Sequence, residues 1–167
     1  MKKKITHNEQ GTKNLGLEIG LLLREEEHVV ILLDGDLGAG KTTLAKGIAK
    51  GLGIEQIVNS PTYTIMKKYN SKDRKRTLYH LDLYRLSNVG SDFDLEEYID
   101  GQGVVVVEWP FKVDELLPND YLLIKIKKLS ETKREFILDC VGYPCKRAVE
   151  YIWKKDYYLM SQLMWCL

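Results

Sequence analysis

Apolar residues fall into two patterns along the chain, and each pattern predicts a different kind of element. Two short runs, 29–33 and 104–107, are continuously apolar, which is typical of strands buried on both faces of a parallel sheet. In the segment after Asn8, and again between 42 and 52, apolar side chains recur every three or four residues. This spacing predicts two amphipathic helices, and Asn8 is placed to cap the first of them.

Shorter apolar segments complete the predicted fold. They indicate one short helix and four more strands, at 94–99 and at 64–69, 77–83, 121–127 and 135–140. The first two of these strands suit a hairpin with a polar tip. The last two must be antiparallel, because the link at 130–133 is too short for a parallel crossover. We therefore expect an α/β fold in which helices flank a mixed, mostly parallel central sheet with antiparallel C-terminal strands.

The length of 167 residues predicts a single domain. Residues 1–142 carry the strands and helices expected for it. Residues 143–167 are rich in aromatic side chains. We interpret them as a C-terminal extension that is helical from Lys146.

Composition narrows the range of partners and compartments. The 25 basic and 24 acidic residues leave a formal net charge of +1, so general binding to polyanions is not expected. Polar residues, not the apolar run of a secretion signal, follow Lys2–Lys4, and no segment reaches the roughly 20 apolar residues that cross a bilayer. Cys140, Cys145 and Cys166 lack the spacing of a zinc site or a disulfide framework. We expect a cytoplasmic protein with free thiols and no membrane contact.

The segment Gly35–Thr42 carries the strongest chemical signal. It has the G-x-x-x-x-G-K-T pattern of a phosphate-binding loop, and it stands between a predicted buried strand and a predicted helix, as that motif requires. Glycines let backbone N–H groups converge on phosphate oxygens, Lys41 can reach the β- and γ-phosphates, and the Thr42 hydroxyl can ligate Mg²⁺. The chain is therefore predicted to be a single-domain P-loop NTPase. Its expected nucleotide-binding residues in this segment are Gly38, Ala39, Gly40, Lys41, Thr42 and Thr43.

Two acidic residues are candidates for holding Mg²⁺. Glu108 directly follows the apolar run 104–107, and Asp82 lies near the end of the strand predicted at 77–83. Ligands of open α/β sheets bind beyond the carboxyl ends of the strands, and Mg²⁺ needs one or two carboxylates beside the phosphates. Two other interpretations remain open, namely that Glu108 caps a following helix or stays solvated, and that Asp82 pairs with Arg85.

Further residues have both a functional and a structural interpretation. The hydroxyls of Ser60 and Thr62 could contact phosphate or water, but local sequence alone favours an ordinary turn. Trp109 either stacks on a base or partner or packs in the core. Arg134 has either a nucleotide role or an exposed place in a turn. His80 could shuttle protons, although a single histidine on a strand is more often structural.

Several classes of phosphate-loop protein do not fit the chain. It has no N-K-x-D segment to read guanine, it is too short for a large mechanical ATPase, and its arginines lack a spacing typical of a kinase lid. A compact hydrolase or switch that acts on another protein remains. The alternatives are a small-molecule or protein kinase and a non-hydrolysing nucleotide-binding adaptor.

Four segments together resemble one family. They are Gly35–Thr43, Ser60–Thr64, Tyr79–Leu86 and Glu108–Pro110, and in order and spacing they resemble the bacterial TsaE (YjeE) family over most of the chain. The resemblance implies an ATPase component of tRNA threonylcarbamoyladenosine synthesis that uses ATP and Mg²⁺. It also implies coupling to the TsaB–TsaD complex, which modifies the adenosine next to the anticodon of ANN-decoding tRNAs. TsaD and TsaB are then the expected partners, and tRNA is contacted through them.

The same resemblance implies the roles of the catalytic residues. Lys41 holds the phosphates, Thr42 and Glu108 hold Mg²⁺, and Asp82 orients the attacking water or supports the metal. Lys41, Asp82 and Glu108 are thus the predicted catalytic residues.

The resemblance also adds positions around the nucleotide. Thr12 matches a family position near the adenine, and Trp109 matches a tryptophan near the nucleotide. The segment Ser60–Thr64 becomes a switch-like loop, against the plain turn that its local sequence favours.

Overall fold

The structure, a computed structural model, describes residues 2–86, 95–99, 101–112, 117–142 and 150. In chain order the elements are β1 (Lys2–Thr6), α1 (Glu9–Leu22), β2 (His28–Asp34), α2 (Lys41–Gly51), β3 (Met66–Asn70), β4 (Thr77–Asp82), α3 (Leu95–Ile99), β5 (Gly103–Glu108), the short 3₁₀ helix η1 (Pro110–Lys112), β6 (Tyr121–Lys128) and β7 (Arg134–Val141). None of the helices in these described ranges is both long and apolar enough to cross a membrane.

The strands form one mixed sheet in the order β1-β7-β6-β2-β5-β4-β3. The four central strands are parallel, and β1, β7 and β3 pair antiparallel at the two sides. This confirms the expected mixed α/β sheet, its hairpin and its antiparallel C-terminal strands. The register sets Asp82 opposite Glu108 and Glu108 opposite Leu33, so both candidate acids lie at the carboxyl edge where the loop after β2 begins.

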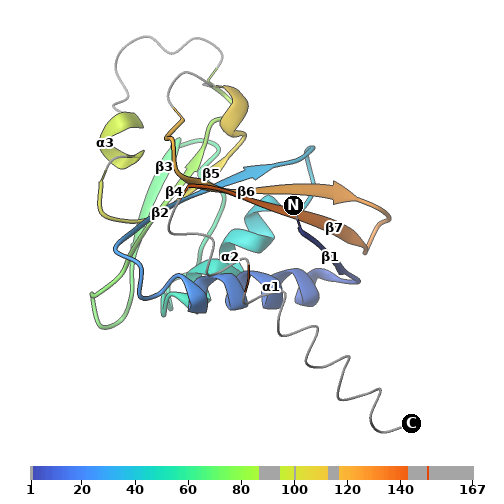
Figure 1. The fold of residues 1–167 in the computed structure, drawn as a ribbon, viewed down its shortest axis with the longest axis horizontal. Coiled ribbons are helices and arrows are strands. Elements are labelled where there is room, and N and C mark those ends of the chain that lie inside the picture. The colour runs from blue at the N-terminus through green and yellow to red at the C-terminus, as the bar shows by residue number, and fades with distance from the viewer. Residues whose placement is uncertain (1, 87–94, 100, 113–116, 143–149, 151–167) are drawn as a thin grey trace, which may run out of the picture.

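Each face of the central strands has its own apolar core, as continuous apolar runs require. Ile31 and Leu33 of β2 pack in one cluster with residues of α1 and α2, such as Ile48. Val30 and Leu32 point the other way and share a cluster with Ile99 of α3. Figure 1 shows the result: α1 and α2 lie together on one side of the sheet, and α3 lies on the other.

Three features depart from the predictions. Lys2–Lys4, for which no strand was predicted, belong to an edge strand that pairs with β7. The third strand begins at Met66, not at residue 64, because the backbone turns at Ile65, where φ is 63°. Cys140 is in a disulfide, so the expected free thiol is wrong for this residue. The other two cysteines and, apart from Glu150, the predicted helical extension lie outside the described residues.

Helices α1 and α2 touch through their backbones at paired glycines. An alanine Cβ at Gly16 would lie 2.9 Å from Gly47 Cα and would meet the Leu44 carbonyl oxygen, and Gly20 faces Gly51 in the same way. Only residues without a side chain allow this approach. Since Lys41 and Thr42 are the first residues of α2, the contact also sets where the end of the phosphate loop lies.

We expect Gly16→Ala to destabilise the protein by about 1–3 kcal/mol, because the added methyl group forces the two backbones apart. For a chain of this size each kcal/mol lowers the melting temperature by roughly 2–4 °C, which calorimetry can measure. Gly11→Ala is a matched control on the same helix, because its Cβ would meet nothing closer than 3.4 Å. Equal melting temperatures for the two variants would contradict the backbone contact.

Candidate nucleotide and metal site

The loop between β2 and α2 presents backbone N–H groups to an open space. Gly40 is the N-cap of α2 with φ 107°, a left-handed conformation that suits glycine, and no side chain of the described residues caps this helix start. The first N–H groups of a helix have no partner within the helix, and they carry its partial positive charge. An uncapped helix start that follows a glycine loop therefore fits a phosphate group.

Lys41 folds back over the loop it ends. Its ammonium donates hydrogen bonds to the carbonyl oxygens of Gly35 (2.6 Å) and Asp36 (3.0 Å) and lies 3.8 Å from the centroid of the Trp109 ring. Burial lowers the pKa of Lys41, although nearby carboxylates, first among them Glu108, act in the opposite direction. Because burial outweighs these carboxylates, a further anionic group beside Lys41 would stabilise its charged form.

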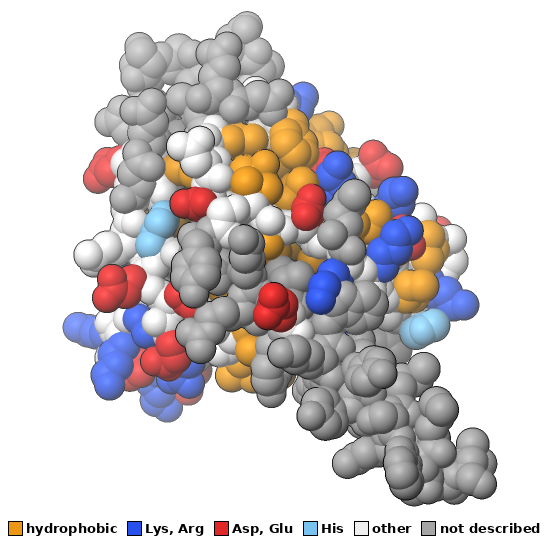
Figure 2. Space-filling model, in the orientation of Figure 1, with side chains coloured by type: hydrophobic (Ala, Val, Ile, Leu, Met, Phe, Trp, Pro, Cys, Tyr) orange, Lys and Arg blue, Asp and Glu red, His pale blue; other side chains and the backbone are white. Residues whose placement is uncertain are grey.

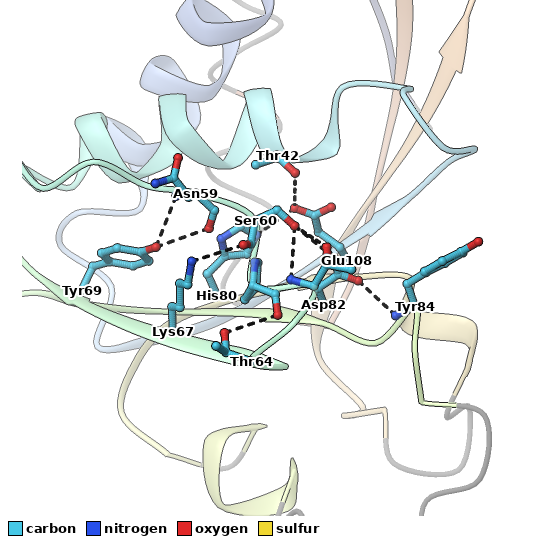
Figure 3. A network of polar contacts seen from close by, with 12 residues as sticks. Thr42, Asn59, Ser60, Thr64, Lys67, Tyr69, His80, Asp82, Tyr84 and Glu108 are labelled. Atoms are coloured by element: carbon cyan, nitrogen blue, oxygen red, sulfur yellow. Dashed lines mark hydrogen bonds and ion pairs between the residues drawn. The ribbon is translucent and has the colours of Figure 1, made fainter.

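Glu108 is buried at the carboxyl end of β5 and is held by two side chains. Thr42 Oγ1 donates a hydrogen bond of 2.9 Å to Glu108 Oε1, and His80 Nε2 lies 2.8 Å from the same oxygen. Figure 3 shows Glu108 between these two residues, with Thr42 on the helix side. With 3% relative exposure, Glu108 is not the solvated acid that one interpretation allowed.

Asp82 binds the segment Ser60–Thr64 to the end of β4. Its Oδ2 accepts hydrogen bonds from the hydroxyls of Ser60 (3.2 Å) and Thr62, and its Oδ1 accepts the Tyr84 N–H at 3.0 Å. Arg85, the alternative partner considered for Asp82, has its Cζ 4.5 Å from the centroid of the Tyr63 ring. The Ser60–Thr64 segment is therefore hydrogen-bonded to a candidate site residue and is not the ordinary turn that its local sequence favours.

These residues surround one cavity of about 440 Å³ at the carboxyl edge of the sheet. Ten predicted site residues line it: Gly38, Gly40, Lys41, Thr42, Thr43, Ser60, Thr62, Asp82, Glu108 and Trp109. Leu37, Tyr84 and Arg85 also line it and were not predicted as site residues. The sequence signal for Tyr84 and Arg85 was their position two and three residues after Asp82, the acid that ends a strand.

Three predicted nucleotide contacts, Thr12, Ala39 and Arg134, lie outside the cavity lining, and Ala39 is buried within the loop itself. Arg134, at the start of β7, donates from Nε to the Ala39 carbonyl oxygen at 2.9 Å and from Nη2 to that of Gly38 at 3.4 Å. Arg134 therefore holds the loop through its carbonyl oxygens and does not line the cavity. Thr12 is buried, with its hydroxyl 2.9 Å from that of Thr6, and its role near the adenine stays a prediction.

The oxygen atoms at this edge suit Mg²⁺. The Thr42 hydroxyl and the Glu108 carboxylate already converge, and the register brings Asp82 beside Glu108. Mg²⁺ prefers such oxygen ligands and usually completes its shell with waters and substrate phosphates. No cluster of three or more His, Cys, Asp or Glu residues suited to a metal occurs in the described ranges.

Comparison with known proteins gives one consistent result. The family model for "Threonylcarbamoyl adenosine biosynthesis protein TsaE" matches residues 6–136. The chain belongs to the TsaE family. The tRNA threonylcarbamoyladenosine biosynthesis protein TsaE of Bacillus subtilis is 47% identical over 127 residues, which cover 76% of this chain and 79% of that protein.

Two further relatives support the same assignment. The TsaE protein of Treponema pallidum is 39% identical over 133 residues, which cover 78% of this chain and 95% of that protein. The crystal structure of Bacillus subtilis YdiB superposes with a TM-score of 0.78 at 39% identity and covers 93% of this chain and 95% of that one. The TsaE match spans the phosphate loop, Asp82, Glu108 and Arg134, and it ends before the aromatic-rich extension.

We expect Arg134→Ala to weaken ATP binding about tenfold or more. The substitution removes the two hydrogen bonds that Arg134 donates to the loop carbonyl oxygens of Ala39 and Gly38. Hydrogen bonds that involve a charged group contribute about 1.5–3 kcal/mol. Fluorescence titration with an ATP analogue measures the change. Lys127→Ala, which removes an exposed cation from the neighbouring strand, serves as the control. An Arg134 variant that binds ATP as tightly as the wild type would show that the loop does not need this support.

Proposed function

We propose that this TsaE family member is a Mg²⁺-dependent ATPase of tRNA threonylcarbamoyladenosine biosynthesis that acts as a switch on the TsaB–TsaD complex. The observation that carries the proposal is the hydrogen bond between Thr42 and Glu108 beside Lys41. It joins a phosphate-binding loop to a strand-end carboxylate, which is the arrangement a Mg²⁺–nucleotide complex requires. The names of the relatives supply the pathway.

The residues of the cavity divide the work of binding and hydrolysis. Backbone N–H groups from Gly38 to Thr42 hold the phosphates together with Lys41, which exchanges its carbonyl partners for phosphate oxygens. Thr42 and Glu108 would hold Mg²⁺, which would supply positive charge against the phosphates. Because Asp82 lies beside Glu108 and is ionisable, it can accept a hydrogen bond from the attacking water or support the metal.

The contact between Asp82 and the segment Ser60–Thr64 offers a route from hydrolysis to a partner. Ser60 and Thr62 are bonded to Asp82, whereas Tyr63, the residue after Thr62, is 85% exposed. A change in the hydrogen bonds of Asp82 would therefore move an exposed aromatic side chain. This is the kind of local change that nucleotide-dependent switches use.

The surface favours indirect contact with tRNA. On the face drawn in Figure 2, the acidic and basic side chains of the described residues lie interspersed, in keeping with the net charge of +1. Affinity for a nucleic acid backbone depends on a concentration of positive charge. We therefore assign tRNA binding to the complex with TsaB and TsaD, in the cytoplasm, and not to this chain alone.

We expect Asp82→Asn to lower ATP hydrolysis by about 10²–10⁴-fold, the range attributed to positioned acid–base groups, while ATP binding largely persists. Phosphate release in the presence of TsaB–TsaD measures turnover, and nucleotide titration measures binding. Asp73→Asn, at the tip of the same hairpin, is the matched control. Unchanged turnover in Asp82→Asn would remove this residue from the reaction, and a wild type that binds ATP without hydrolysing it would support an adaptor.

The partner dependence is tested with the wild type. Its ATP turnover should be slow alone and should rise about tenfold or more when the cognate TsaB–TsaD pair is added, because the partner then holds the Ser60–Thr64 segment through its exposed residues Tyr63 and Thr64. An equally large complex that lacks affinity for TsaE is the control. Strong phosphorylation of a sugar, nucleoside or peptide by the isolated protein would instead favour the kinase alternative.

A further inference from the structure

His80 lies behind the candidate metal site and has no exposed surface. It stands on β4, two residues before Asp82 and next to the β5 strand that carries Glu108. Its Nε2 lies 2.8 Å from Glu108 Oε1, whereas its buried Nδ1 has no hydrogen-bond partner among the residues that the structure describes. Buried polar atoms without a partner are uncommon in native proteins, and each one calls for an explanation.

We propose that His80 is a positioning residue of the metal site, which acts through Glu108 and holds its carboxylate in the orientation that binds Mg²⁺. The inference rests on the proposed function and adds to it a residue outside the cavity lining. A histidine on this strand was expected to be structural. Among the described residues, however, its only side-chain hydrogen bond is with the carboxylate assigned to the metal.

The contacts of the ring indicate which nitrogen carries its proton. An ionised carboxylate oxygen only accepts hydrogen bonds, so the contact with Glu108 requires a proton on Nε2. A second proton on Nδ1 would be a buried donor without an acceptor among the described residues, which is costly. The neutral ring with its proton on Nε2 fits these contacts. It orients Glu108 without neutralising its charge, whereas a lysine or arginine there would compete with the cation.

The two donors to Glu108 approach from different elements and share one oxygen. Thr42 comes from the start of α2 and His80 from the middle of β4, and both hydrogen bonds end on Oε1. Two donors on one oxygen resist rotation of the carboxylate. They also leave Oε2, and the lone pairs of the Thr42 hydroxyl, available to Mg²⁺ or to its bound water. This pattern of a ligand held by a second residue is common at metal sites, where loss of that residue costs about 10–100-fold in metal affinity or activity.

The test compares two variants of the full-length protein. His80→Leu fills a similar volume without a donor, and His80→Gln keeps an N–H that can reach Glu108. The affinity for a fluorescent ATP analogue is measured in excess MgCl₂ and again in EDTA, and the ratio of the two affinities reports the contribution of Mg²⁺. His28→Leu is the control, because His28 begins β2 at the opposite end of these strands from Glu108, and its ring contacts the Gly103 carbonyl oxygen.

We expect the Mg²⁺-dependent ratio to fall about tenfold, or to unity, in His80→Leu, with the affinity in EDTA unchanged. In His80→Gln and His28→Leu the ratio should stay within about threefold of the wild type. The inference is overturned if His80→Leu behaves like the wild type, if both His80 variants lose the ratio equally, or if binding in EDTA falls as far as binding in MgCl₂. A wild type whose binding does not depend on Mg²⁺ would instead count against the proposed function.

A measurement on the unmodified protein keeps the inference testable if His80→Leu does not fold. Two-bond ¹H–¹⁵N spectra distinguish the two neutral forms of a histidine ring, and the His80 signal can be assigned from the His80→Gln spectrum. We expect the Nε2–H form, with a shift of its resonances when MgCl₂ is added to the nucleotide complex. A ring protonated on Nδ1 alone, or one whose signals do not respond to Mg²⁺, would contradict the proposal.

Discussion

Glu108 Oε1 is the atom on which the candidate site depends. A hydroxyl from the first turn of α2 and an imidazole from β4 both bond to it, so one oxygen joins the helix that follows the phosphate loop to two neighbouring strands. Because binding constellations tolerate errors of only about 0.5 Å, a shared acceptor is an economical way to set several groups at once. The parallel register of β2, β5 and β4 makes this possible, since it brings three strand ends to the same height.

Two charged residues of the cavity, Asp82 and Lys41, are stabilised by hydrogen bonds, but burial acts against the charge of Lys41. Asp82 is stabilised by two hydroxyls and a backbone N–H, and Lys41 by two carbonyl oxygens and the face of Trp109. Even so, burial lowers the pKa of Lys41 against the pull of the carboxylates. Trp109 also has a φ of 59°, which is unusual for a bulky residue. A shifted pKa and an uncommon backbone conformation in one cavity are typical of a functional site.

Much of the fold could be predicted because its signals are local. Continuous apolar runs identified β2 and β5, and a motif of eight residues identified the loop between β2 and α2. Strand β1 was missed because its partner, β7, lies more than 120 residues away, and three lysines at a terminus look solvated when that partner is unknown. The sequence predicted the individual residues at the carboxyl edge, but it did not predict which of them contact one another. That Ser60 and Thr62 bond to Asp82, or His80 to Glu108, follows from the register and the chain path, which no short segment encodes.

The glycine contact between α1 and α2 combines two opposing effects: glycine lowers the stability of each helix, but it allows the two helices to pack closely. Glycine within a helix costs about 0.5–1 kcal/mol relative to alanine, yet α2 contains Gly47 and α1 contains Gly16 and Gly20. The cost is offset by a backbone approach that larger residues would prevent. Because α2 then packs on both α1 and the sheet, its first residues cannot shift without breaking a contact at its far end. The rigidity that positions Lys41 and Thr42 therefore arises more than a helical turn away from them, in residues that touch no ligand.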